Sequence, residues 1–248
     1  MKEVNSIKHH YDHHLSDFYT WSLGDIQAKQ ASFQEFLLQN QLAPKSTRLC
    51  LDLGAGSGLH SVPLANVGYT VKAIDFSAKL LAEFSELASN LGIEFIEGDI
   101  RNIQKYASGL TPELIVCMGD TVTHLENINE VERLIYSCSQ LLAEEGKLLL
   151  SFRDYSKEVV GKQRFIPVHS DDQRIHTCIL KFGKDKVCVT DLLHLRKNFG
   201  WKQSVSTYRK IRLDPVYVEE ALTSEGLDIR YHDTIEGMVY LLGVKSSN

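Results

Sequence analysis

The chain has 248 residues with a formal net charge of −5, and 43% of the residues are hydrophobic. This length suits one elaborated α/β domain or two small ones, with a core large enough to fold without disulfides. The mild acidity, without any run rich in Lys and Arg, makes nucleic acid an unfavourable partner. Because no apolar run approaches about 18 residues and the chain start lacks a signal-peptide core, we expect a cytoplasmic protein without membrane contact.

Residues 1–40 contain no proline and no strong strand pattern, and they are predicted to be helical. Their "HHYDHH" segment (9–14) has histidine pairs four residues apart, a spacing that can bind a metal on a helix. The segment lacks a clear third ligand, so surface histidines and no bound metal are expected. The five cysteines show no Cys-x-x-Cys spacing, and we expect reduced, mostly buried thiols.

From residue 41 to residue 154, strand and helix patterns alternate. Strands are expected at 48–53, 69–75, 93–99, 113–119 and 147–154, and helices at 58–68, 77–92 and 128–146. Apolar strands that alternate with helices are typical of a doubly wound, mostly parallel α/β sheet.

The pattern changes at residues 155–213, which we expect to form an inserted antiparallel β meander. Its three β-rich segments, 174–183, 185–197 and 201–213, are joined by turns containing Gly, Asp and Asn. Residues 214–248 are expected to return to the core, beginning with a helix that has Asp214 as N-cap and Pro215 at its first position. The final strands, 227–233 and 238–245, must then pair as a hairpin.

Three signals at successive strand ends indicate a nucleotide site. "LDLGAGSGLH" (51–60) places Gly54, Gly56 and Gly58 directly after a strand, without the last glycine of a dinucleotide loop or the lysine of a P-loop. Asp75 ends the second strand roughly twenty residues later, where a carboxylate accepts hydrogen bonds from ribose hydroxyls. Asp99 follows the third strand, where it can accept from an adenine amino group.

In these motifs the chain resembles the class I S-adenosylmethionine-dependent methyltransferases over residues 48–152 and in the closing hairpin. The resemblance implies a seven-stranded Rossmann-like sheet whose terminal strand is antiparallel, and a cofactor site for S-adenosylmethionine in residues 41–154. The implied cofactor-binding residues of the core are Gly54, Ala55, Gly56, Gly58, Asp75, Phe76, Asp99, Ile100, Met118 and Gly119.

The polar ends of the fourth and fifth strands suggest where a methyl acceptor binds. "GDTVTHL" and "RDY" resemble the Gly-Asn-Ser-x-x-His-Leu and Arg-Asn-Tyr runs of the glycine and sarcosine N-methyltransferase group. That resemblance places Arg153 on a substrate carboxylate, with Tyr155 beside it. Asp120 stands where the group has Asn, and it favours a cationic amine or a hydroxyl. His124 is the candidate base, although a structural hydrogen bond explains it equally well.

The aromatic residues of the N-terminal segment also resemble that group, in which such a segment folds over the cofactor. Tyr11, Tyr19 and Trp21 would then form a lid that excludes water and faces the sulfonium with aromatic rings. An amphipathic helix whose aromatic residues belong only to the core remains open as an alternative.

Together these patterns predict a methyltransferase of a small molecule, such as an amine or an amino acid. A methyltransferase of protein or RNA, and a non-catalytic S-adenosylmethionine-binding protein, remain open as alternatives. A homo-oligomer is compatible with the sequence, which contains no signal for or against it.

Overall fold

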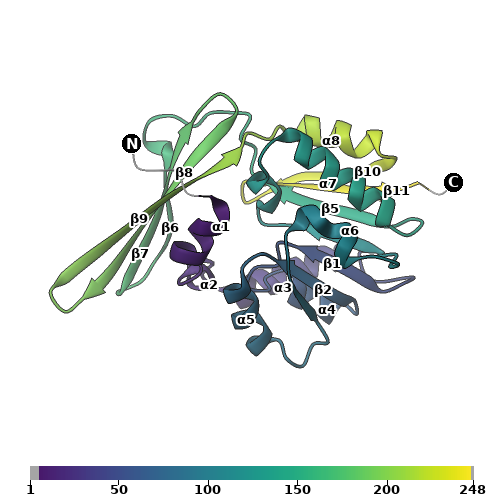
Figure 1. Ribbon diagram of the computed structural model, residues 1–248, viewed down its shortest axis with the longest axis horizontal. Coiled ribbons are helices and arrows are strands. Elements are labelled where there is room, and N and C mark those ends of the chain that lie inside the picture. The colour runs from purple at the N-terminus through teal and green to yellow at the C-terminus, as the bar shows by residue number, and fades with distance from the viewer. Residues whose placement is uncertain (1–5, 247–248) are drawn as a thin grey trace.

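The computed structural model describes residues 6–246, and its larger sheet has seven strands (Figure 1). These are β1 (Leu49–Leu53), β2 (Thr70–Asp75), β3 (Glu94–Glu97), β4 (Leu114–Cys117), β5 (Lys147–Phe152), β10 (Leu227–Ile235) and β11 (Met238–Lys245). The strand order is β10-β11-β5-β4-β1-β2-β3, and β11 pairs antiparallel with both of its neighbours. The predicted seven-stranded, mostly parallel sheet is therefore confirmed. Its order reverses at β1, so a crevice opens at the carboxyl ends of β1, β2 and β4.

Helices cover both faces of this sheet. One face carries α6 (Ile103–Tyr106), α7 (Ile128–Leu141) and α8 (Pro215–Ser224), and the other carries α3 (Ile26–Gln39), α4 (Ser61–Asn66) and α5 (Ala78–Leu87). Successive residues of β1 point to opposite faces, so Cys50 belongs to one core cluster and Leu51 to the other. Asp214 caps α8 through the Val216 N–H, and Pro215 is at the first helical position, as predicted.

A separate antiparallel sheet is inserted between β5 and α8. It begins after a short 3₁₀ helix (Gly161–Arg164) and contains β6 (Phe165–Ser170), β7 (Arg174–Phe182), β8 (Lys186–Lys197) and β9 (Gly200–Ile211), in that order. The meander is confirmed with one strand more than the sequence predicted. The additional strand, β6, lies at the sheet edge and has a register shift between Pro167 and His169. An edge position tolerates proline, which lacks the N–H of a ladder hydrogen bond.

The N-terminal segment lies between the two sheets (Figure 1). Its helices are short before α3: α1 (Ile7–His10), a π-helical turn (Tyr11–Leu15) and α2 (Tyr19–Ser22). Residues 1–5 of the predicted lid lie outside the described residues. The expectation of surface histidines is wrong for two of the four, because His10 is fully buried and His14 is 9% exposed. The reason is that both rings pack toward the second sheet, which the sequence pattern does not reveal.

All five cysteines are free thiols, and Cys50, Cys117 and Cys138 are buried, as expected. Within residues 6–246, no helix has the length and apolar character needed to span a bilayer.

Candidate active site

A cavity of about 530 Å³ lies at the carboxyl ends of β1, β2 and β4, within the size range of small-molecule sites. Its wall is built from four parts of the chain: the N-terminal segment, the strand-end loops of the core, the start of α7, and two strands of the second sheet. Among the predicted site residues, those that line it are Tyr11, Tyr19, Gly54, Gly56, Asp75, Phe76, Asp99, Ile100, Gly119 and His124.

The glycine loop forms the floor of the cavity, and its glycines have different roles. Gly54 and Gly56 both line the cavity with positive φ angles of 80° and 54°. A Cβ at Gly54 would overlap the Thr121 side chain, and one at Gly56 would lie 3.3 Å from the Tyr19 ring. Gly58 does not line the cavity, and a Cβ there would overlap Phe84 of α5. It therefore permits close packing rather than ligand approach.

Asp75 fixes the loop to the end of β2. Its Oδ2 accepts the Gly56 N–H at 2.9 Å and its Oδ1 accepts the Ser77 N–H at 2.8 Å, so the carboxylate has one orientation. Burial raises the pKa of Asp75, while these N–H donors oppose the shift. Beneath the loop, the fully buried Asp52 accepts the Ser61 hydroxyl at 2.5 Å, and burial raises its pKa to about 7.

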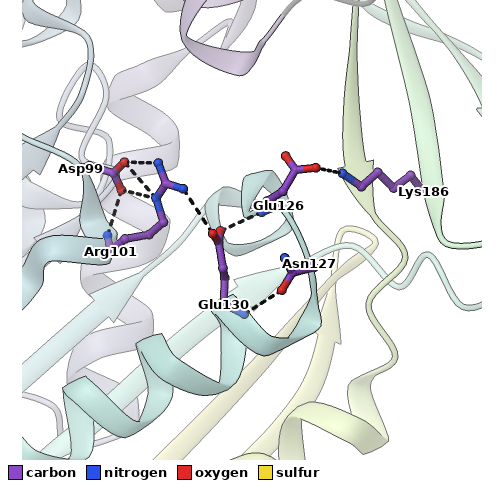
Figure 2. Close-up of polar contacts among 6 residues, drawn as sticks. All are labelled: Asp99, Arg101, Glu126, Asn127, Glu130 and Lys186. Carbon is purple, nitrogen blue, oxygen red and sulfur yellow. Dashed lines mark hydrogen bonds and ion pairs between the residues drawn. The ribbon is translucent and has the colours of Figure 1, made fainter.

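Asp99 is held in a chain of charges along one edge of the cavity (Figure 2). The Arg101 guanidinium donates to both Asp99 oxygens and reaches Glu130 at 3.2 Å. Glu130 in turn accepts the Glu126 N–H at 2.9 Å, and the Glu126 carboxylate pairs with Lys186 of β8. The chain therefore connects the β3 loop to the second sheet across the start of α7.

Aromatic rings form another part of the cavity wall. The Tyr11 ring lies 6.0 Å from Tyr19, 5.3 Å from Phe76 and 5.9 Å from His124, measured between ring centroids. Trp21, predicted to join them, lies outside the cavity, where its indole N–H donates to Asp171 at 2.7 Å. Ala55 and Met118 are likewise buried away from the cavity, at 4% and 2% exposure.

Asp120 and Tyr155 belong to a buried polar cluster next to the cavity and do not line it. Asp120, at a φ of 72°, accepts the Arg153 N–H and the Tyr155 hydroxyl, each at 3.0 Å, and pairs with Lys210 of β9 at 2.5 Å. The amine that Asp120 attracts in this structure is therefore the chain's own Lys210. The Arg153 residue is exposed and does not line the cavity.

His124 is the last residue of a 3₁₀ turn (Thr121–His124) and lines the cavity. Its Nδ1 is buried without a hydrogen-bond partner among residues 6–246. Burial lowers the pKa of His124 well below its usual value, and the nearby charge of Lys210 acts in the same direction. The imidazole is therefore neutral, and its Nδ1 is available for a hydrogen bond with a ligand.

Sequence reasoning missed several charged residues of the cavity. Arg101 and Glu130 line it from the core, and Lys186 and Arg209 line it from the second sheet. Arg101 directly follows the Asp99 motif, which could have drawn attention to it. No local pattern marks Lys186 or Arg209, because only the packing of the second sheet over the core places them there.

Comparison with known proteins agrees with this geometry. Residues 50–146 match the family model described as a methyltransferase domain. A glycine/sarcosine N-methyltransferase of Halorhodospira halochloris is 29% identical over 62% of this chain and 58% of its own length. A ubiquinone biosynthesis O-methyltransferase of Caulobacter sp. (strain K31) is 33% identical over 41% of this chain and 39% of its own. This chain thus matches less than two thirds of the length of either relative.

Solved structures extend the similarity to almost the whole chain. The CcbJ methyltransferase of Streptomyces caelestis superposes with a TM-score of 0.79 at 16% identity, covering 97% of this chain and 99% of that one. Residues 50–146, which match the methyltransferase family model, contain the glycine loop, Asp75 and Asp99. Residues 50–146 therefore match a methyltransferase domain, and the chain has the fold of the S-adenosylmethionine-dependent methyltransferases.

Proposed function

We propose that this protein is an S-adenosylmethionine-dependent methyltransferase whose acceptor is a small molecule, with N-methylation of an amine or amino acid as its reaction. The observation that carries the proposal is the cavity at the carboxyl ends of β1, β2 and β4, in which the glycine loop, Asp75 and Asp99 meet. The N- and O-methyltransferases among the relatives support the coarser activity, and the glycine/sarcosine enzymes support the amine.

The residues present fit the cofactor. Gly54 and Gly56 present bare backbone to the cavity, against which the amino-acid part of the ligand could lie, and a side chain at either position would press on Thr121 or Tyr19 of the cavity wall. Asp75 would accept the ribose hydroxyls, and Asp99 with Ile100 would hold the adenine. When bound, S-adenosylmethionine supplies an electrophilic methyl group on a positively charged sulfur. The rings of Tyr11 and Tyr19 favour such a cation and exclude water from it.

His124 is the residue best placed to orient the acceptor. Its Nδ1 is unpaired among the described residues and its imidazole is neutral, so it can form a hydrogen bond with the amine or hydroxyl group of the acceptor, while its lowered pKa makes it a weak base. The transfer itself needs no acid for the leaving thioether. Alignment of the acceptor with the methyl group therefore supplies most of the acceleration.

We assign to Arg209 the carboxylate-binding role that the sequence predicted for Arg153. Arg209 lines the cavity from β9, and no hydrogen bond or ion pair involves its guanidinium within residues 6–246. A free guanidinium binds a carboxylate through two parallel hydrogen bonds, which lysine cannot reproduce. An amino-acid acceptor would then have its acid group at the second sheet and its nitrogen near the core.

Radiolabelled S-adenosylmethionine tests the proposal directly. We expect label to move to a compound in a small-metabolite pool and not to RNA or cell protein. Label in RNA or protein would support the macromolecular alternative, and binding without any transfer would support a non-catalytic protein.

The two arginines provide a matched pair once the acceptor is identified. Arg209→Lys keeps the charge and loses the paired geometry, so kcat/KM should fall roughly ten- to a hundredfold, while Arg153→Lys should leave it unchanged. The reverse result would return the role to Arg153. If both variants keep full activity, the acceptor has no acid group at this site.

A further inference from the structure

A cluster of nitrogen, sulfur and oxygen donors lies in the second sheet, apart from the residues that line the cavity. Cys178 of β7 is directly opposite Asp191 of β8, and His176 is two residues from Cys178, so all three side chains share one face of the sheet. His176 Nε2 lies 3.0 Å from Asp191 Oδ1, and Cys178 Sγ lies 2.7 Å from the same oxygen. The sulfur and the His176 nitrogen are 3.7 Å apart.

A fourth group reaches the cluster from the N-terminal segment. His10 Nε2 lies 2.9 Å from Asp191 Oδ2, and its Nδ1 lies 2.7 Å from the Ser206 hydroxyl of β9. His10 and Asp191 are 0% and 1% exposed, and His176 is 4% exposed. Both oxygens of a buried carboxylate are thus fixed, one of them toward the imidazole and thiol of β7.

We propose that His176, Cys178 and Asp191 bind one Zn²⁺ ion, with His10 as the residue that orients the carboxylate. The three donor atoms lie within 4.8 Å of one another. Zinc bonds of about 2.0–2.3 Å in a tetrahedron separate neighbouring ligand atoms by roughly 3.3–3.7 Å. The observed separations reach this range with shifts of less than an ångström, and imidazole, thiolate and carboxylate together are ligands that zinc favours.

The partners around the cluster match the surroundings of metal sites in proteins. The second oxygen of the Asp191 carboxylate lies 2.9 Å from His10 Nε2, and the His10 ring is itself held by the Ser206 hydroxyl through Nδ1. Such outer contacts hold a ligand in the orientation that the metal requires. When the ion binds, a zinc–sulfur bond forms and the Cys178 thiol releases its proton to solvent.

Because His10 belongs to the N-terminal segment, a bound ion would also affect how this segment packs. His10 is followed by Tyr11, which lines the cavity, and its ring packs 4.2 Å from Tyr208 of β9. An ion bound to Asp191 would therefore fix the N-terminal segment against the second sheet and hold Tyr11 at the cavity wall. The sequence suggested no metal because the histidines near residue 10 and the ligands at 176–191 are far apart in the chain.

Metal titration of the full chain tests this proposal. Protein stripped with a chelator is titrated with Zn²⁺ in competition with a coloured chelator, and in parallel with Co²⁺, whose absorption reports a thiolate ligand. We expect one ion per chain and a thiolate-to-cobalt charge-transfer band. Cys178→Ser and Asp191→Asn should each weaken zinc affinity at least tenfold, and Cys178→Ser should abolish the band.

Two matched variants control for other donors. Cys188→Ser removes the neighbouring thiol of β8, and His9→Ala removes an exposed imidazole that lies 4.4 Å from the His13 ring. Neither should change the affinity or the spectrum. Loss of binding in His9→Ala with full binding in Cys178→Ser would place zinc on the surface histidines and overturn the proposal. Absence of a thiolate band in the unaltered protein would overturn it without reference to any variant.

Discussion

At the scale of single residues, Asp75 is the group on which cofactor affinity should depend most. Its carboxylate is fixed by the Gly56 and Ser77 N–H groups and faces the cavity. Asp75→Ala should weaken binding of S-adenosylhomocysteine by about 2–4 kcal/mol, because charged hydrogen bonds to the ribose hydroxyls are lost. Calorimetry measures this change, with Asp185→Asn at an exposed turn as the control. Unchanged affinity in Asp75→Ala would show that the ribose lies elsewhere.

Asp52 should determine part of the pH dependence of stability. Burial, reinforced by the charge of Asp75, raises the pKa of Asp52 to about 7, although the Ser61 hydroxyl opposes the shift. A carboxyl whose pKa is higher in the folded state stabilises the fold at low pH, and this contribution is lost as the pH rises from about 4 to 7. Asp52→Asn has no group that titrates at this position. Its free energy of unfolding, relative to that of the unaltered protein, should therefore rise by a few kcal/mol between about pH 4 and pH 7.

Denaturant unfolding at several pH values tests this expectation. The difference in free energy of unfolding between Asp52→Asn and the unaltered protein should increase up to pH 7 and then remain level. Asp185→Asn, at an exposed position, is again the control. A difference that does not vary with pH would mean that Asp52 titrates normally in the folded protein.

At the scale of elements, the buried Asp120–Lys210 pair joins the ends of β4 and β5 to β9. Lys210→Ala would leave the Asp120 carboxylate with only the Arg153 N–H and the Tyr155 hydroxyl. Loss of one partner from a buried pair should cost about 3–5 kcal/mol of unfolding free energy. Glu126→Ala removes the exposed pair with Lys186, which also connects the core to the second sheet, and should cost less than about 1 kcal/mol. Equal costs in the two variants would contradict a structural role for Asp120.

Elements with strong local patterns could be predicted from the sequence, and those that depend on distant contacts could not. The seven strands of the core and the cap of α8 follow from apolar runs, glycines and the Asp214–Pro215 pair. The β6 strand carries Pro167 at a sheet edge and has no such pattern. The sequence predicts that the N-terminal segment is helical, but it does not predict where one short helix ends and the next begins. These short helices lie between the two sheets, and their packing there, rather than a local pattern, determines their bounds.

At the scale of the whole molecule, the same distinction applies to the site. The glycine loop, Asp75 and Asp99 lie at strand ends of one parallel sheet, so sequence order alone brings them to one edge. Lys186 and Arg209 reach the cavity only because the second sheet lies over that edge. Arg153 follows β5 in a motif that suggests a substrate-binding residue, yet Arg153 is exposed and does not line the cavity. Long-range packing, which no local motif encodes, decides which of these cations lines the cavity.

The central claim is that the cavity at the ends of β1, β2 and β4 binds S-adenosylmethionine. Calorimetric titration with S-adenosylhomocysteine tests it most directly, using the unaltered protein and Gly56→Val. We expect one molecule to bind per chain, NAD to give no heat of binding, and Gly56→Val to remain folded without binding, because a branched side chain at a φ of 54° would fill the floor of the cavity. Normal affinity in a folded Gly56→Val protein, or no binding by the unaltered protein, would contradict the account.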